Sequence, residues 1–190
     1  FDPDVLSFLD GLERCYVDAA QVYAHCVSTT RRPDRAPSLR LAFVYAVDPH
    51  LFCVPSLHVM VVGYTWKKLS DLLAARGLAD RFSAELAALH DRAVRITESI
   101  LYVRQHSVNC IPAGFSLLGG ILTSFGQAET DSIAHALFAG EPQMSEQERA
   151  AVLSYMDGLY RQVSAGSNDT SGRIDAINAF MDGYRPLFDI

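Results

Sequence analysis

The sequence Pro-Ser-Leu-His at residues 55–58 begins the segment that decides how this chain folds. Serine is a favoured N-cap because its hydroxyl accepts a hydrogen bond from a backbone N–H of the first helical turn. Ser56 follows a proline and precedes a long apolar run, which together indicate the start of a helix. We therefore predict a helix from Leu57 to about Arg76, ended by Gly77.

Apolar residues recur at spacings of three and four on both sides of this helix, as in amphipathic helices. Further helices are predicted over residues 3–27, 80–104, 113–124, 131–139, 145–163 and 173–184. Residues 39–47 form an apolar run that could be a helix or a strand. Pro112 is expected to interrupt the chain, and Ser145 with Glu148 forms a predicted capping box. The pattern predicts an all-α fold of seven or eight helices, in one domain over residues 1–190.

The composition limits the classes of function. With 190 residues, of which 49% are hydrophobic, the chain can bury a sizeable core. Its net charge of −6 supplies no basic field, so we expect no nucleic-acid partner. The four cysteines, Cys15, Cys26, Cys53 and Cys110, lack the spacing of metal ligands. We expect buried free thiols and no metal site, although an exported protein could pair these cysteines.

One uncharged stretch, residues 107–125, is long enough to cross a bilayer. It contains Asn109, Pro112, three glycines and several serines, so a buried core helix explains it better than a membrane span. The sequence begins at Phe1 without a methionine, so a preceding segment could have been removed. A periplasmic or exported protein, peripheral association with a membrane, and anchoring through a missing N-terminus all stay open.

Two histidines stand out by their positions. His58 lies in the first turn of its predicted helix, where free backbone N–H groups attract anions, phosphate above all. It could protonate an oxygen leaving that phosphate, although a histidine near a helix start is more often a capping or core residue. His106 ends another long helix, after Ser99 and Arg104. The Arg104 guanidinium could bind two phosphate oxygens, or these residues could simply complement the helix dipole. Likewise, the basic loop at Arg32 could be a solvated surface or part of an anion pocket.

Taken together, these segments resemble the type 2 phosphatidic acid phosphatase and haloperoxidase-like superfamily. Residues 55–58 match its central motif, in the branch that has leucine before the histidine and an Asp-Pro pair upstream, as at residues 48–49. Residues 99–106 resemble its third motif, with serine seven residues before histidine, glutamine directly before it, and Ala-Gly downstream at residues 113–114. His25, separated by six residues from Arg32-Pro33, has the shape of the first motif. The resemblance covers about residues 25–120.

The resemblance implies a helical bundle that hydrolyses or transfers phosphoryl groups without a metal or cofactor. His106 would be the nucleophile that forms a phosphohistidine, and His58 would be the general acid. The residues implied in phosphate binding are Arg32, Arg104, Ser56, Ser99 and His25. The implied partner is a phosphomonoester or diphosphate, either a small molecule or a lipid. A transferase that moves a head group between lipids is a further alternative within the same chemistry.

Three positions depart from the family pattern. Ile100 stands where the family has an arginine after the third-motif serine, and Arg104, about one helical turn further on, could substitute for it. His25 stands where the family has a lysine. Cys110 replaces the aspartate that orients the nucleophilic histidine, and a thiol is a poor acceptor. The alternative hypothesis is therefore a catalytically degenerate scaffold that binds a ligand or partner without turnover.

Overall fold

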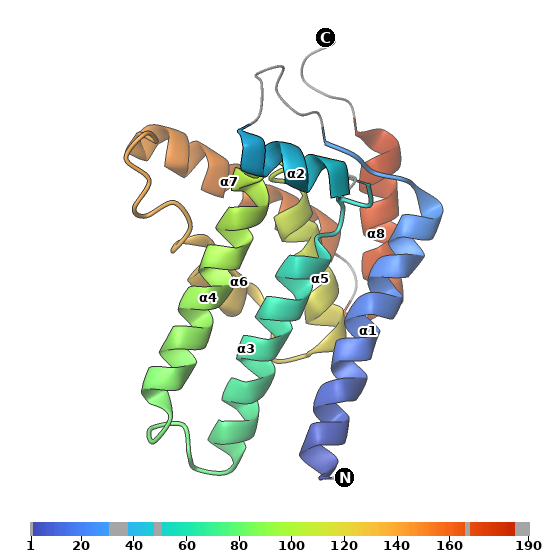
Figure 1. Ribbon diagram of the computed structural model, residues 1–190. Coiled ribbons are helices and arrows are strands. Elements are labelled where there is room, and N and C mark those ends of the chain that lie inside the picture. The colour runs from blue at the N-terminus through green and yellow to red at the C-terminus, as the bar shows by residue number, and fades with distance from the viewer. Residues whose placement is uncertain (1, 31–37, 48–50, 166–167, 185–190) are drawn as a thin grey trace.

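The computed structural model describes residues 2–30, 38–47, 51–165 and 168–184. These residues form helices and no sheet, which confirms the predicted all-α class and the expected seven or eight helices. The helices are α1 (Pro3–His25), α2 (Leu39–Val47), α3 (Leu57–Ala75), α4 (Ser83–Tyr102), α5 (Cys110–Ile121), α6 (Gln127–Ala134), α7 (Glu146–Ser164) and α8 (Thr170–Gly183). In Figure 1, α1, α3, α4, α5 and α8 run roughly alongside one another, and α2 lies across one end of them.

Local signals in the sequence account for several helix ends. Ser56 caps α3, because its side chain accepts a hydrogen bond from the Val59 amide. The helix stops just before Gly77, whose φ of 66° is in the left-handed region that glycine adopts readily. At the start of α7, Ser145 and Glu148 form the predicted capping box. The apolar run at residues 39–47 is a helix.

Several predicted boundaries were wrong, including the start of α8, which is Thr170 and not residue 173. α4 begins at Ser83 and not at residue 80, and α6 begins at Gln127 and not at residue 131. α5 begins at Cys110, so Pro112 lies inside its first turn and does not interrupt it. Proline is tolerated at that place because the first amides of a helix have no acceptor within the helix.

α5 is the central helix of the bundle. Every residue from Cys110 to Gly119 is buried, because α5 packs against α1, α3, α7 and α8. This confirms that the uncharged stretch around α5 includes a core helix. Among the residues described, no helix has both the length and the apolarity that crossing a membrane requires.

Three loops meet at one end of the bundle. α1, α4 and α8 end there, α3 and α5 begin there, and α2 crosses above them (Figure 1). The loop after α1 pairs with the loop before α3, through an antiparallel bridge between Thr29 and Leu51 and a 2.8 Å hydrogen bond from the Val54 amide to Ser28 Oγ. It also reaches the loop between α4 and α5, because the Thr30 hydroxyl donates to the Gln105 carbonyl over 3.3 Å. These contacts bring together segments that are far apart in the sequence.

Candidate active site

The two histidines singled out by the sequence lie side by side at this end of the bundle. His58 is exposed in the first turn of α3, and His106 is half-buried in the loop between α4 and α5. Their ring centroids are 5.6 Å apart, with the ring planes at 83° to each other. One phosphoryl group could therefore contact both imidazoles.

A backbone carbonyl holds the His106 ring. His106 Nδ1 lies 3.0 Å from the carbonyl oxygen of Cys53. A carbonyl can only accept, so Nδ1 carries the hydrogen, and in the neutral ring the lone pair is then on Nε2. The backbone amide of His106 also donates to the Ile100 carbonyl over 3.4 Å. The ring is thus oriented with Nε2 in the form that can act as a nucleophile or base.

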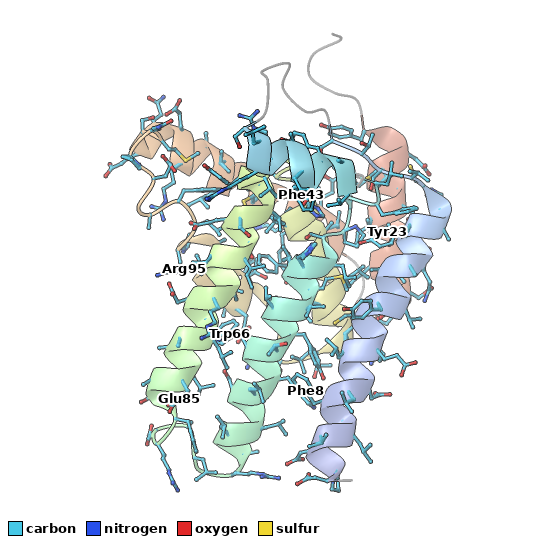
Figure 2. All side chains as sticks on the ribbon, viewed as in Figure 1. Phe8, Tyr23, Phe43, Trp66, Glu85 and Arg95 are labelled. Atoms are coloured by element: carbon cyan, nitrogen blue, oxygen red, sulfur yellow. The ribbon has the colours of Figure 1, made fainter. Side chains whose placement is uncertain are left out.

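The loop that supplies this carbonyl is itself fixed. The Cys53 amide donates to the Ser28 carbonyl over 3.3 Å, and the Cys53 thiol donates to the Gln105 carbonyl over 3.0 Å. The Tyr23 hydroxyl donates to the Pro55 carbonyl over 2.6 Å. Burial raises the pKa of that hydroxyl, so Tyr23 remains a donor. Figure 2 shows Tyr23 near the end of α1 that belongs to the site.

Sequence reasoning missed these positioning groups. The acceptor for His106 is a main-chain oxygen, which no side-chain motif can reveal. Cys53 itself was predicted only to be a buried thiol, and it is fully buried. The sequence shows Tyr23 among the regularly spaced apolar residues of the first predicted helix. That position predicts packing against the core and does not reveal a hydrogen bond to a loop.

Ser56 connects the two motif segments. It is fully buried, and its amide donates to the carbonyl of Cys110 over 3.0 Å. That amide is therefore not available to a ligand. The Val59 and Met60 amides bond to Ser56 itself, so within α3 the amides of Leu57 and His58 have no intrahelical acceptor. The Leu57 amide is directed at the Tyr23 hydroxyl, so the His58 N–H is the part of the Ser56–His58 backbone that could contact an anion.

Gly114 explains how α5 comes so close to the start of α3. A Cβ atom at Gly114 would lie 3.1 Å from the Ser56 carbonyl oxygen and 3.5 Å from side-chain atoms of Val59 and Met60. Only a residue without a side chain leaves this contact unstrained. The glycine downstream of the third motif thus has a packing role that supports the site.

Cys110 does not replace the missing carboxylate. It is fully buried at the start of α5, and its sulfur accepts a 3.2 Å hydrogen bond from the Ser107 amide. Burial raises the pKa of the thiol to about 12, so it is neutral near pH 7. The side chain of the preceding residue, Asn109, accepts a 2.7 Å hydrogen bond from the Tyr155 hydroxyl. The described hydrogen bond that orients the His106 ring is the one to the Cys53 carbonyl.

The structure places two predicted phosphate ligands in other contacts. Ser99 is exposed on α4, and its hydroxyl donates to the Ile96 carbonyl over 2.9 Å. His25 ends α1, and its Nε2 lies 3.0 Å from a carboxylate oxygen of Asp182 on α8. These contacts do not bring Ser99 or His25 to the histidine pair.

The predicted arginines are placed differently. Arg104 is half-buried in the turn after α4, two residues before His106, with a φ of 59°. Its amide donates to the Leu101 carbonyl over 2.9 Å, which closes the turn. Binding of phosphate by Arg104 stays a prediction. Arg32 lies outside the described residues.

A separate cavity of about 450 Å³ lies elsewhere, between α5, α6 and α7. Neither His58 nor His106 lines it. The candidate site is therefore identified by the two histidines and their geometry. It lies at the surface, where a phosphoryl group can reach the exposed His58. Within the described part of the chain, no three His, Cys, Asp or Glu side chains lie close enough to hold a metal ion.

We compared the chain with protein-family models, with curated proteins and with solved structures, and none of the three comparisons gave a significant match.

Proposed function

We propose that this protein is a metal-independent phosphatase that acts through a phosphohistidine intermediate on His106. The observation that carries the proposal is the hydrogen bond between His106 Nδ1 and the Cys53 carbonyl, next to the ring of His58. This hydrogen bond makes Nε2 of the neutral ring the nucleophile. The nearby His58 imidazole can donate a proton to the leaving oxygen and later accept one from water.

In the first step, His106 Nε2 attacks phosphorus and the bond from phosphorus to the leaving oxygen breaks. Protonated His58 gives its proton to that oxygen. In the second step, neutral His58 takes a proton from water, whose oxygen attacks phosphorus. The P–N bond breaks, and inorganic phosphate leaves. The His58 amide and the Arg104 guanidinium are the described donors proposed to stabilise the phosphoryl oxygens.

The surroundings of the site favour a substrate with an apolar group. Phe43 on α2, Phe52 before the central motif and Tyr102 at the end of α4 are 68%, 42% and 80% exposed. Figure 2 shows Phe43 on α2, the helix that crosses this end of the bundle. Exposed aromatic side chains beside a phosphate site suit a lipid phosphate or another phosphoester with an apolar leaving group.

The test is phosphate release with a metal chelator present. The substrates are p-nitrophenyl phosphate, inorganic diphosphate and phosphatidic acid in detergent micelles, which separate soluble from lipid substrates. We expect His106→Ala to lower the rate by about 10³-fold or more, because it removes the nucleophile. His90→Ala is the matched control: His90 lies on α4, bonded to Ser132, and its loss should leave the rate unchanged.

One observation favours the alternative, a degenerate scaffold that binds a phosphate ligand without turnover. The position of the orienting carboxylate holds the neutral, buried thiol of Cys110. Under this alternative, no substrate is hydrolysed and no acid-labile phosphate is found on His106, while inorganic phosphate still shifts the NMR signals of His58 and His106. Trapping the phosphohistidine by mass spectrometry at alkaline pH decides between the two.

A further inference from the structure

Of the described helices, α2 is the only one without a buried residue. It is also the one described helix that packs extensively against no other helix. Its sequence, Leu-Arg-Leu-Ala-Phe-Val-Tyr-Ala-Val, nevertheless contains a single charged residue, Arg40. A water-exposed helix of this composition does not serve the core, and a large exposed apolar patch usually marks an interaction surface.

The most exposed side chains of α2 lie on one face. Leu39, Phe43 and Val47 are spaced four residues apart, which places them on the same side of the helix. They are 91%, 68% and 61% exposed. Leu39 and Val47 begin and end the helix, about 12 Å apart along its axis at 1.5 Å per residue. The apolar face therefore runs along the whole of α2.

More exposed aromatic side chains lie at the same end of the bundle. Phe52 directly precedes Cys53, whose carbonyl holds His106, and Tyr102 is the last residue of α4. In Figure 1, α2 crosses the end of the bundle at which α4 ends and α3 begins. The exposed apolar residues of this end, here called the docking face, are Leu39, Phe43, Val47, Phe52 and Tyr102.

The charges around the docking face are mainly basic, although the chain has 22 acidic and 16 basic residues. Arg40 is exposed on α2, and Arg104 follows α4. In α2, in the described loops at this end and in the adjoining helix turns, the one carboxylate is that of Asp182. It lies 3.0 Å from His25 Nε2. An apolar face with arginines at its edge is complementary to an anionic surface that has an apolar interior.

We propose that the docking face binds the surface of an anionic lipid bilayer. α2 lies in the plane of the membrane surface, with its apolar face toward the acyl chains and Arg40 among the head groups. Its nine residues span about 14 Å, which is too short to cross a bilayer and suits a helix that lies within the interface.

A bilayer fits this face better than a protein does. Two copies of the chain docked through it would bring two basic surfaces together, and like charges across an interface oppose binding. A protein seated there would also cover the exposed His58, whereas a bilayer presents phosphate groups to it. This second argument rests on the proposed function, and the first does not.

The experiment measures cosedimentation of the full chain with lipid vesicles. One set of vesicles is pure phosphatidylcholine, and the other is an equal mixture of phosphatidylcholine and phosphatidylglycerol. We expect at least about tenfold stronger binding to the anionic vesicles, weakened by added salt. His106→Ala should bind like the wild type, because docking needs no turnover. Failure of the phosphatase proposal would leave vesicle binding intact, and failure of docking would leave hydrolysis of p-nitrophenyl phosphate intact.

Matched variants test where the bilayer binds. Leu39→Ser removes an apolar side chain from the docking face and should weaken vesicle binding by about tenfold. Leu9→Ser makes the same change at a half-exposed position on α1, outside the docking face, and should have no effect. Arg40→Gln should weaken binding to anionic vesicles by about fivefold. Arg92→Gln, at an exposed position in the middle of α4, should not.

Three results would overturn the proposal. The first is binding to anionic vesicles that is no stronger than binding to neutral ones. The second is an equal effect of Leu39→Ser and Leu9→Ser while circular dichroism shows both variants folded. The third is a dimer in sedimentation equilibrium that Leu39→Ser dissociates, which would assign the docking face to a second copy of the chain.

Discussion

His106 Nδ1 lies 3.0 Å from the main-chain carbonyl of Cys53, so a neutral oxygen orients the ring of the proposed nucleophile. A carbonyl fixes the ring and its tautomer as a carboxylate does. Unlike a carboxylate, a carbonyl carries no full negative charge to stabilise the cationic ring that forms when Nε2 bonds to phosphorus. The Cys53 contact therefore supplies the geometry of a histidine nucleophile but not the negative charge that a carboxylate would add.

Restoring the carboxylate should raise the rate. In Cys110→Asp, a carboxylate at the start of α5 would place a negative charge near His106 and favour its phosphorylated, cationic form. We expect an increase in kcat on the order of tenfold, measured with p-nitrophenyl phosphate. The cost is lower stability, because the position is fully buried. Cys110→Ala is the control, since it removes the thiol and adds no charge. A folded Cys110→Asp protein no faster than Cys110→Ala would show that the Cys53 carbonyl already does all that this position can do.

The role of His58 can be separated from that of His106 by the leaving group. p-Nitrophenolate leaves without needing a proton, whereas the alkoxide of an alkyl phosphate needs one. His58→Ala should therefore slow the first step strongly for an alkyl phosphate and only slightly for p-nitrophenyl phosphate. With p-nitrophenyl phosphate, the attack of water on the phosphohistidine becomes the slow step in this variant. A burst of p-nitrophenol of about one equivalent per protein should then precede the steady state. Equal loss of rate for both substrates, without a burst, would argue against a general acid at His58.

The close contact between α5 and α3 makes a prediction about Gly114. In Gly114→Ala, the new Cβ would lie 3.1 Å from the Ser56 carbonyl oxygen, a main-chain atom that must move by a few tenths of an ångström. We expect a loss of about 1–3 kcal/mol in the free energy of unfolding, measured with urea. A Cβ at Gly158 on α7 would have no atom within 4 Å, so Gly158→Ala should stabilise the helix by about 0.5–1 kcal/mol. If both substitutions had the same effect, the contact at Gly114 would not be tight.

The cysteines should differ in reactivity. Burial raises the pKa of Cys15 and of Cys110 to about 12, so at pH 8 only about one thiol in 10⁴ is ionised. Cys53 is also buried, whereas Cys26 is half-exposed at the end of α1. A short pulse of iodoacetamide on the folded protein, read by mass spectrometry, should label Cys26 first. Labelling of Cys110 should rise with pH and become comparable to that of Cys26 only on unfolding. Fast labelling of Cys110 in the folded protein would contradict its burial.

The sequence predicts those features that depend on neighbouring residues along the chain. Ser56 and the pair Ser145–Glu148 begin their helices as expected, because a cap is a contact across three residues. The start of α5 was misplaced, because a proline both ends helices and fits their first turn, and only tertiary packing decides between the two.

Within the site, the positions of His58 and His106 were recognisable because their side chains carry the motif. The acceptor at Cys53 was not, since any residue type could supply that carbonyl. The contacts of Ser99 with its own helix and of His25 with Asp182 were also invisible, because they depend on which way each helix face turns.

Tyr23 offers the most direct test of the loop that orients His106. In Tyr23→Phe, the Pro55 carbonyl loses its 2.6 Å hydrogen bond but the ring can stay against Phe52, whose centroid is 5.3 Å away. A buried carbonyl left without a donor costs about 1–3 kcal/mol, and urea unfolding should show a loss of that size. Because Pro55 lies two residues from Cys53, the same change should loosen the carbonyl that holds His106. We therefore expect kcat to fall severalfold while KM changes little, since Tyr23 is a positioning residue and does not contact substrate. Tyr16→Phe, at an exposed position on α1, is the control and should alter neither quantity. Lower stability with an unchanged kcat would mean that the contacts of Ser28 and Gln105 hold the loop without Tyr23.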